Sequence, residues 1–250
     1  MTAVHPTAAH TDGLRALWKE AFGDGDAFLD LFFATAFARE RCLCIPDGER
    51  IAAALYWFDC ACDGQPCAYI YAVATAGTHR GRGLCRTLMA QAHQTLADRG
   101  YAGVLLVPGD AGLAAMYAAM GYAFCTGLGS FSAEAADGSP ILHPLSPQEY
   151  ALRRRALLPP HGTVQEGENL AFLAAQAAFY GGDGWLCAVR RESDRAVGLE
   201  WLGDRAVAPT VVATLGCREG VFRTVGDTPF AMWHALTAAA PPAYFGFAFD

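Results

Sequence analysis

Basic side chains are scarce in this sequence, and lysine is almost absent. Lys19 is the single lysine beside 17 arginines, and 25 acidic residues give a formal net charge of −7. This balance excludes a strongly basic nucleic-acid-binding protein. Only 17% of the residues are charged and 53% are hydrophobic, which is the opposite of a disordered chain. The composition therefore predicts a globular protein without nucleic acid among its partners.

The sequence also lacks an apolar run that could cross a membrane. Its longest uncharged stretch, 111–133, holds four glycines, two tyrosines and two serines, so it is too polar and too broken for a membrane helix. The first residues show no cationic segment followed by an apolar one, which argues against a secretory signal. We therefore expect a cytoplasmic protein with no membrane partner.

The nine cysteines do not have the pattern of a disulfide framework, because their number is odd and they are scattered from 42 to 217. Cys42 with Cys44 and Cys60 with Cys62 are spaced two apart, and with Cys67 they raise the alternative of a metal site. The spacing lacks the paired pattern of zinc sites, whereas residues two apart on a strand share one face of a sheet. We expect reduced thiols and no metal.

Local patterns divide the first half of the chain into helices and strands. Apolar residues at helical spacing predict helices at 11–22 and 26–38, and short apolar runs between turn residues predict strands at 41–45, 50–59 and 67–75. We then expect a helix from 84 to about 100, a strand at 102–107, a helix that Asp110 caps, and a strand at 122–131.

A stretch rich in proline and glycine between 133 and 147 predicts a boundary between domains 1–140 and 141–250. Beyond it the patterns predict helices at 147–158, 168–180 and 205–215, and strands at 184–191, 196–202, 220–225 and 243–250. Two helices followed by strands and a helix repeat the order of the first half. The fold class predicted is α/β with mixed sheets, in two similar halves.

A loop rich in glycine and arginine, 78–84, is the most informative segment. Gly81 and Gly83 would let a phosphate approach the main chain, and the N-terminus of the following helix offers unpaired N–H donors. Three arginines add fixed cationic charge: Arg80, Arg82 and Arg86. The loop therefore predicts a diphosphate site. Neither the P-loop motif nor the dinucleotide fingerprint fits, because no Lys-Ser or Lys-Thr follows and Arg86 stands at the third glycine.

The loop resembles the signature of the GCN5-related N-acetyltransferases (GNAT), R/Q-x-x-G-x-G/A, through Arg80, Gly83 and Cys85. Cys85 departs from the family's usual glycine or alanine. A second segment, from Met116 to Tyr122, is similar to the Leu-Tyr-x-x-x-Gly-Phe helix end of the same family. Together the two motifs relate about half of the chain to this family.

This resemblance implies the GNAT acyl-CoA N-acyltransferase fold and acetyl-CoA as co-substrate, bound where two neighbouring parallel strands splay apart. It implies main-chain pairing of the pantetheine with Val73, Ala74 and Thr75, with an N–H of Ala74 or Thr75 facing the thioester oxygen. The pyrophosphate would be held by the amides of Arg80, Gly81, Arg82, Gly83, Leu84 and Cys85. It further implies direct attack of an amine on the thioester, with Tyr117 as the acid.

Several roles stay open at this stage. Tyr117 could instead be a core residue, since it shares a helical stripe with Leu113 and Met120. The candidates for the general base are Asp59, Asp110, Tyr71, a water chain and the terminal carboxylate of Asp250. We expect His79 to be an exposed loop residue and His93 to be solvated.

The second half has no match to the loop signature, and Asp204 stands where a second phosphate loop would need cations. We interpret Asp204 as a helix cap and expect a degenerate half that does not bind the cofactor. The aromatic residues of the tail are expected in the core, with an acceptor pocket as the alternative: Phe230, Trp233, Tyr244, Phe245, Phe247 and Phe249.

The sequence thus predicts an acetyl-CoA-dependent N-acetyltransferase that acts on a primary amine, either a small molecule or a peptide. The alternatives are a non-catalytic acyl-CoA-binding module or sensor, and a protein for another phosphate ligand. The sequence does not define the oligomeric state.

Overall fold

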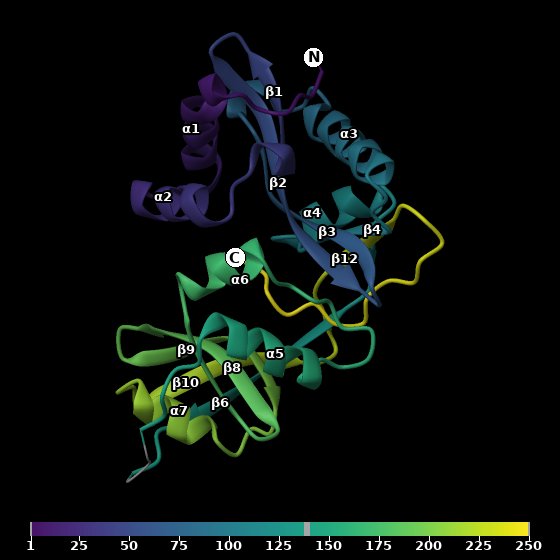
Figure 1. Cartoon of the computed structure of the whole chain (residues 1–250). Coiled ribbons are helices and arrows are strands. Elements are labelled where there is room, and N and C mark those ends of the chain that lie inside the picture. Colours follow the sequence, from purple (N-terminus) through teal and green to yellow (C-terminus); the bar gives the residue numbers. More distant parts are fainter. Residues whose placement is uncertain (1, 138–140, 250) are drawn as a thin grey trace. The chain divides into compact units, whose positions relative to one another are not determined.

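The computed structural model describes residues 2–137 and 141–249, which form two compact units (Figure 1). The first unit holds the residues up to Ala123 together with Met232–Pro241, and the second holds Phe124–Ala231 and the C-terminal residues from Pro242. This division differs from the expected domains 1–140 and 141–250. Residues 124–134 belong to the second unit, and a short C-terminal segment returns to the first.

The first unit contains a six-stranded mixed sheet with the strand order β1-β2-β3-β4-β12-β5. Its strands are β1 (Cys42–Asp47), β2 (Arg50–Cys62), β3 (Gln65–Thr75), β4 (Gly103–Leu106), β5 (Ala123–Phe124) and β12 (Met232–Ala235). The first three strands form the predicted antiparallel meander. Asp63 and Gly64 close its second hairpin with φ angles of 49° and 76°, as a two-residue hairpin turn requires.

Helices cover both faces of this sheet, as Figure 1 shows for α1 and α3. The helices of the unit are α1 (Thr11–Phe22), α2 (Asp26–Thr35), α3 (Leu84–Asp98) and α4 (Ala111–Ala118), with short 3-10 turns at Ala8–His10, Arg39–Arg41 and Gly77–His79. On one face, Trp18 of α1 lies 4.6 Å from Phe32 and 5.1 Å from Tyr56 between ring centres. On the other face, α3 buries Leu88 and Met89 in the core.

The second unit contains a sheet with the order β11-β6-β10-β9-β8-β7. Its strands are β6 (Gly127–Glu134), β7 (Ala178–Gly182), β8 (Trp185–Glu192), β9 (Arg195–Gly203), β10 (Glu219–Val225) and β11 (Thr228–Pro229). Its helices are α5 (Pro147–Leu157), α6 (Glu168–Ala174) and α7 (Ala208–Thr214). Three antiparallel strands, a helix and a parallel strand follow one another here as in the first unit, so the expected repetition of topology is confirmed.

The first sheet receives a strand from far along the chain, and the second sheet contains a strand that precedes the expected boundary at 140. β12 lies between β4 and β5 in the first sheet, and β6 lies between β10 and β11 in the second. The single strand expected at 122–131 is therefore wrong, because its residues divide between β5 and β6 in different sheets. Local alternation cannot reveal such a division, since both pieces have a strand pattern.

Two further predicted elements differ from the structure. The helix expected at 168–180 ends at Ala174, and Ala178–Gly182 is β7, which pairs with β8 across a turn at Asp183 and Gly184. The strand expected at 243–250 is absent over 243–249, where Tyr244 forms only an isolated bridge with Gly162.

A side chain takes the place of a neighbouring strand for this tail. The amide oxygen of Gln165 accepts hydrogen bonds from the main-chain N–H groups of Gly246 and Phe247, and its nitrogen donates to the carbonyl of Phe247. The tail aromatics Tyr244, Phe245, Phe247 and Phe249 are buried, as predicted for core residues.

A fully buried ion pair anchors the second unit. Arg154 of α5 forms two hydrogen bonds with the carboxylate of Glu200 on β9, at 2.8 and 2.9 Å. The hydroxyls of Tyr150 and Tyr244 donate to the same carboxylate at 2.7 and 3.0 Å. A Cβ at Gly246 would overlap this carboxylate. Glu200 therefore ties α5, β9 and the C-terminal segment together.

Breaking this pair should destabilise the protein strongly. In Glu200→Gln the buried guanidinium of Arg154 loses its counter-charge, and such a change costs about 3–5 kcal/mol. Glu166→Gln is the matched control, because it removes the partner of the neighbouring but exposed Arg155 and should leave stability almost unchanged. Urea denaturation followed by circular dichroism measures both, and equal losses would contradict the assignment.

Candidate active site

The parallel strands β3 and β4 pair over only three positions. Cys67–Tyr69 of β3 lie opposite Gly103–Leu105 of β4. β3 then continues to Thr75 with β2 as its partner, whereas β4 ends at Leu106. The last residues of β3 therefore have no partner strand on the β4 side within the described part of the chain.

A β-bulge at Ala72 accompanies this opening. The pairing of β2 with β3 shifts register between Ala54 and Tyr56, and Ala72 has a φ of 49°. Such a left-handed conformation is uncommon for a residue with a Cβ and is typical of strained functional positions. Because a bulge bends its strand and increases the local twist, this one turns the end of β3 away from the line of β4.

The opening exposes the main chain of alternate residues. The N–H of Ala76 donates to the carbonyl of Ala52 on β2 at 2.9 Å, and successive residues of a strand direct their polar groups to opposite sides. Val73 and Thr75 therefore direct theirs away from β2, and the carbonyl of Thr75 accepts from the Nε of Arg80. Ala74 faces β2, so its main chain does not offer the pairing that the sequence predicted for it.

The loop after β3 presents a row of unpaired amides. None of the N–H groups from Gly81 to Arg86 donates to an acceptor among the described residues. Gly81 and Gly83 have φ angles of 76° and 74°, and a Cβ built on either would meet no atom within 4 Å. These amides lie at the N-terminus of the 15-residue helix α3, where the helix dipole favours an anion.

The arginines of the loop surround these amides without being neutralised. Arg80, Arg82 and Arg86 are exposed, and none of them forms an ion pair with a described carboxylate. Two of them donate hydrogen bonds to main-chain carbonyls: Arg80 donates to Thr75, and Arg86 donates to Ala119. The positive charge is therefore available to a ligand.

His79 is not the exposed loop residue that the sequence predicted. Its side chain is buried, with 9% of the residue's surface exposed. One ring nitrogen lies 2.9 Å from the hydroxyl of Thr78, and the other lies 3.0 Å from the carboxylate of Asp47 in the β1–β2 hairpin. On the opposite side, Glu20 of α1 accepts the N–H of Gly77 at 2.6 Å. These contacts hold the start of the loop from two sides.

Tyr117 lies in the core beneath the loop. Helix α4 begins as predicted, with the carboxylate of Asp110 accepting the N–H of Leu113 at 2.7 Å. Tyr117 is 6% exposed and packs in the same cluster as the half-buried Cys85 of the loop. Burial, with Cys85 nearby, raises the pKa of the phenol well above its ordinary value. The hydroxyl therefore keeps its proton at neutral pH.

His93 is also not solvated as predicted. Its Nε2 lies 2.7 Å from the hydroxyl of Tyr122, and its ring stacks on His234 of β12 with centres 4.1 Å apart. Gly121 makes room for this arrangement, since its φ is 89° and a Cβ there would lie 3.1 Å from Nδ1 of His234. Burial, and secondarily His234, lowers the pKa of His93 to about 4.

The candidate bases are not equally available. Asp110 is engaged as the cap of α4, and Asp59 accepts the hydroxyl of Tyr101 at 2.6 Å and lies 3.6 Å from Arg41. Tyr71 directly precedes the bulge and lies among aromatic rings, 5.7 Å from Trp18. The terminal carboxylate of Asp250 lies outside the described residues.

The second unit lacks a comparable opening. Its parallel strands β9 and β10 pair from Arg195 opposite Glu219 to Trp201 opposite Thr224, with a register shift between Phe222 and Thr224, so their pairing extends over more positions than that of β3 and β4. Asp204 accepts the N–H of Ala206 at 2.9 Å and so caps the turn before α7 rather than the helix itself.

Metal ligands, disulfides and membrane helices can be searched for among the described residues. Within 2–137 and 141–249, no group of three or more potential ligands could hold a metal ion, and none of the nine cysteines is in a disulfide. No helix in that part of the chain is long and apolar enough to span a bilayer. Cys42 and Cys44 share the buried face of β1, as their spacing predicted.

Comparison with protein families agrees with this geometry. The family model described as "Acetyltransferase (GNAT) domain" matches residues 4–125. These residues form a GNAT acetyltransferase domain. The span contains both motifs, the opening between β3 and β4, and the loop. A comparison with the curated proteins found no match.

Solved structures extend the similarity beyond this GNAT domain. A GCN5-related N-acetyltransferase from Kribbella flavida superposes with a TM-score of 0.72 at 19% identity, over 93% of this chain and 70% of that one. Eis1 from Mycobacterium abscessus superposes with a TM-score of 0.67 at 14% sequence identity, over 94% of this chain and 74% of that one. A tandem GNAT protein from the clavulanic acid biosynthesis pathway has a TM-score of 0.58 at 16% sequence identity, over 95% of this chain and 99% of that one. At these identities the similarity establishes the fold, which confirms two GNAT-like halves.

The half-buried His93 should make stability depend on pH. In the folded protein the pKa of His93 is lowered from 6.5 to about 4. As pH falls, His93 is therefore protonated in the unfolded chain at a higher pH than in the folded protein. Stability should therefore decline from about pH 6.5 to about pH 4. His93→Gln, which can still accept the hydroxyl of Tyr122, should flatten this decline in denaturation curves. The exposed His143 is the control, and an identical effect of His143→Gln would contradict the assignment.

Proposed function

We propose that this protein is an acetyl-CoA-dependent N-acetyltransferase with its active site in the first unit. The observation that carries the proposal is the parting of β3 and β4, which leads directly into the unpaired amides from Gly81 to Arg86. An extended, anionic co-substrate needs both features. The first accepts the pantetheine arm as an added strand, and the second accepts the pyrophosphate.

The residues present fit such a ligand. Val73 and Thr75 would pair with the amide groups of the pantetheine, since their polar groups face the opening. The amides beyond Gly81, together with the three loop arginines, would bind the pyrophosphate. No atom lies within 4 Å of a Cβ position at Gly81 or Gly83, so the phosphates can approach the main chain closely. Cys85, the departure from the family pattern, points into the core cluster and leaves this approach open.

Acetyl-CoA would supply the acetyl group as a thioester, which a neutral amine attacks. The arm would run back along β3 from the loop, so the N–H of Val73, which faces the opening farther from the loop than that of Thr75, would stabilise the charge that develops on the thioester oxygen. Tyr117, protonated at neutral pH, would donate its proton to the departing thiolate. Since Asp59 and Asp110 are engaged in structural contacts, the remaining routes for the proton of the amine are Tyr71, a water chain and the terminal carboxylate of Asp250.

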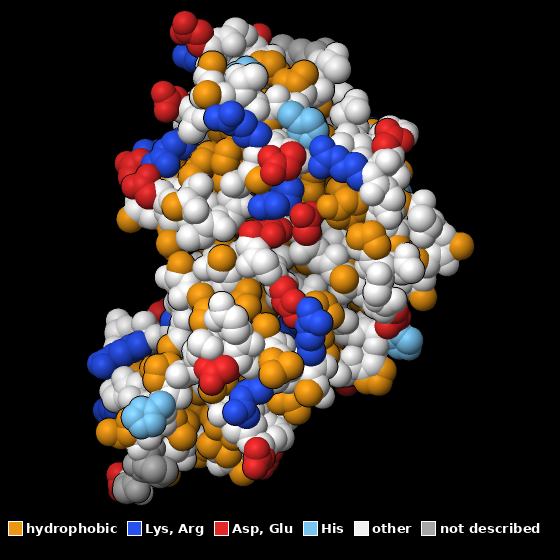
Figure 2. Space-filling model, viewed as in Figure 1, with side chains coloured by type: hydrophobic (Ala, Val, Ile, Leu, Met, Phe, Trp, Pro, Cys, Tyr) orange, Lys and Arg blue, Asp and Glu red, His pale blue; other side chains and the backbone are white. Residues whose placement is uncertain are grey.

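The acceptor would be a primary amine of a small molecule or peptide. The net charge of −7 favours the approach of cationic amines. On the face shown in Figure 2, acidic and basic side chains are interspersed and no broad basic patch forms, which supports an amine rather than nucleic acid as the partner. A non-catalytic acyl-CoA sensor is the competing function, because it needs the loop but no base.

Tyr117→Phe tests catalysis directly. Removing the acid should lower turnover by about 100-fold while coenzyme A still binds, because the ring keeps its packing. The measurement is thiol release from acetyl-CoA with a panel of primary amines. Tyr122→Phe is the matched control, since it removes another buried hydroxyl of the same motif that bonds to His93. Binding of coenzyme A without turnover of any amine would favour the sensor.

Gly81→Ala tests the phosphate loop, with Gly64→Ala as its control. Both glycines have a φ of 76° and open space around a Cβ position. Each substitution should therefore cost a similar stability, about 1 kcal/mol. Only Gly81→Ala should weaken coenzyme A binding, by about tenfold or about 1.4 kcal/mol. Calorimetric titration measures the affinity, and an equal effect of both variants would place the nucleotide elsewhere.

A further inference from the structure

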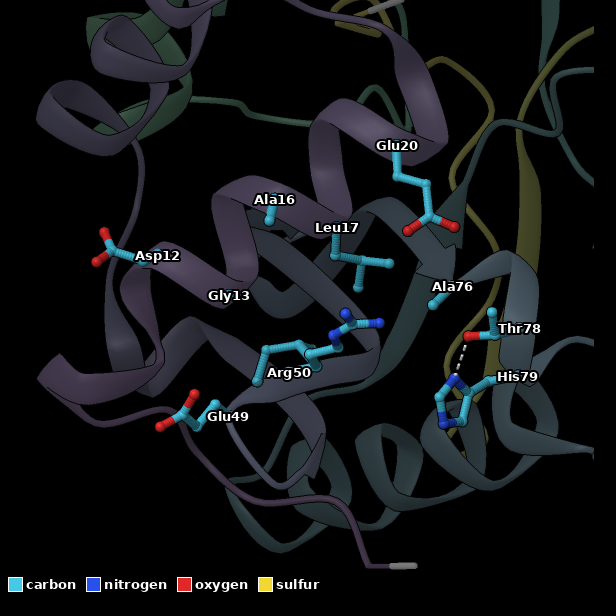
Figure 3. Close-up of a pocket in the computed structure, with 11 residues that line it drawn as sticks. Asp12, Gly13, Ala16, Leu17, Glu20, Glu49, Arg50, Ala76, Thr78 and His79 are labelled. Carbon is cyan, nitrogen blue, oxygen red and sulfur yellow. Dashed lines mark hydrogen bonds between the residues drawn. The ribbon is translucent and has the colours of Figure 1, made fainter.

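A cavity lies in the first unit, on the α1 side of the loop (Figure 3). Its volume is about 460 Å³, within the range of small-molecule sites. Its walls come from α1, the start of β2 and the residues that follow β3. None of the groups to which we assign coenzyme A lines it. The cavity is therefore separate from the opening between β3 and β4.

Two opposite charges enter this cavity without neutralising each other. Arg50 extends across it toward Ala76 and Thr78, and Glu20 reaches in from α1 (Figure 3). No described acidic group forms an ion pair with Arg50. Glu20 uses Oε1 for the N–H of Gly77, and the structure gives its Oε2 no hydrogen bond. A guanidinium and a carboxylate oxygen are thus both available to one ligand.

The rest of the lining sets the character of that ligand. Apolar side chains from α1, β2 and the end of β3 form part of the wall: Ala16, Leu17, Ile51 and Ala76. The hydroxyl of Thr78 adds a polar group beside His79. The other two acidic residues of the lining, Asp12 and Glu49, point away from the centre of the cavity in Figure 3.

We propose that this cavity binds a free α-amino acid with an aliphatic side chain. The guanidinium of Arg50 would bind the α-carboxylate through paired hydrogen bonds. The free oxygen of Glu20 would accept from the α-ammonium, and the apolar wall would receive the side chain. Arg50 and Glu20 are exposed, and a zwitterion pairs with both of their charges at once, whereas an anion or a cation pairs with only one of them.

Calorimetric titration of the full chain with leucine, isoleucine, valine and alanine tests this site. At least one of them should bind saturably, with one molecule per chain. Two analogues of leucine isolate its charges, since 3-methylbutylamine lacks the carboxylate and 4-methylpentanoate lacks the ammonium group. Each should bind at least tenfold more weakly than leucine. Absence of binding by all four amino acids, or equal binding of leucine and its analogues, would overturn the proposal.

Variants locate the binding in this cavity. Arg50→Gln should weaken amino-acid binding at least tenfold, and so should Glu20→Gln, which keeps an acceptor for the N–H of Gly77. Glu49→Gln is the matched control and should bind like the wild type, because its carboxylate points away. Equal affinity of Arg50→Gln and Glu49→Gln would overturn the assignment. Coenzyme A titrated into the same variants tests the proposed function separately, since that outcome does not depend on Arg50.

Discussion

The bend of β3 at Ala72 is the constraint on which the first unit depends. The pairing of β3 with β4 ends at Tyr69 opposite Leu105, whereas β9 and β10 pair over more positions in the second unit. The bend uses a backbone conformation that costs a residue with a Cβ of the order of 1–3 kcal/mol. The packing and hydrogen bonds of the surrounding sheet and helices must offset this cost in the free energy of folding. The loop and the N-terminus of α3 can bind an extended ligand only because β3 and β4, which precede and follow them, are not paired along their whole length.

The two sheets show how one arrangement of strands serves two purposes. In both, three antiparallel strands lead through a helix to a parallel strand, and a further antiparallel strand lies beside that one. The first sheet gives up main-chain pairing and leaves polar groups free for a ligand. The second keeps its strands paired, and its buried polar side chains bond to one another: the carboxylate of Glu200 accepts hydrogen bonds from Arg154, Tyr150 and Tyr244. Both β2–β3 and β8–β9 contain a register shift, but among the described non-glycine residues of β3 and β9 only Ala72 has a left-handed φ.

Much of the local structure could be predicted because its causes are local. Apolar spacing gave the limits of α1, Asp110 marked the start of α4, and turn residues separated the strands of the meander. The loop could be found from its glycines and arginines. Other features depend on residues far apart in the chain, so no local pattern contains them. The stacking of His234 on His93 and the burial of His79 against Asp47 are of this kind, as is the tail held by Gln165.

The return of β12 to the first sheet has a consequence for how the protein is made. Met232–Ala235 supply the strand beside β4, and Trp233 lies directly over Gly103, where a Cβ would overlap its ring. Nearly the whole polypeptide must therefore be synthesised before the first sheet can acquire its strand β12. Dividing the 250-residue chain at its midpoint would separate β12 from the first sheet, whereas β6 would stay with the second, so only the first sheet would need the other fragment to become complete.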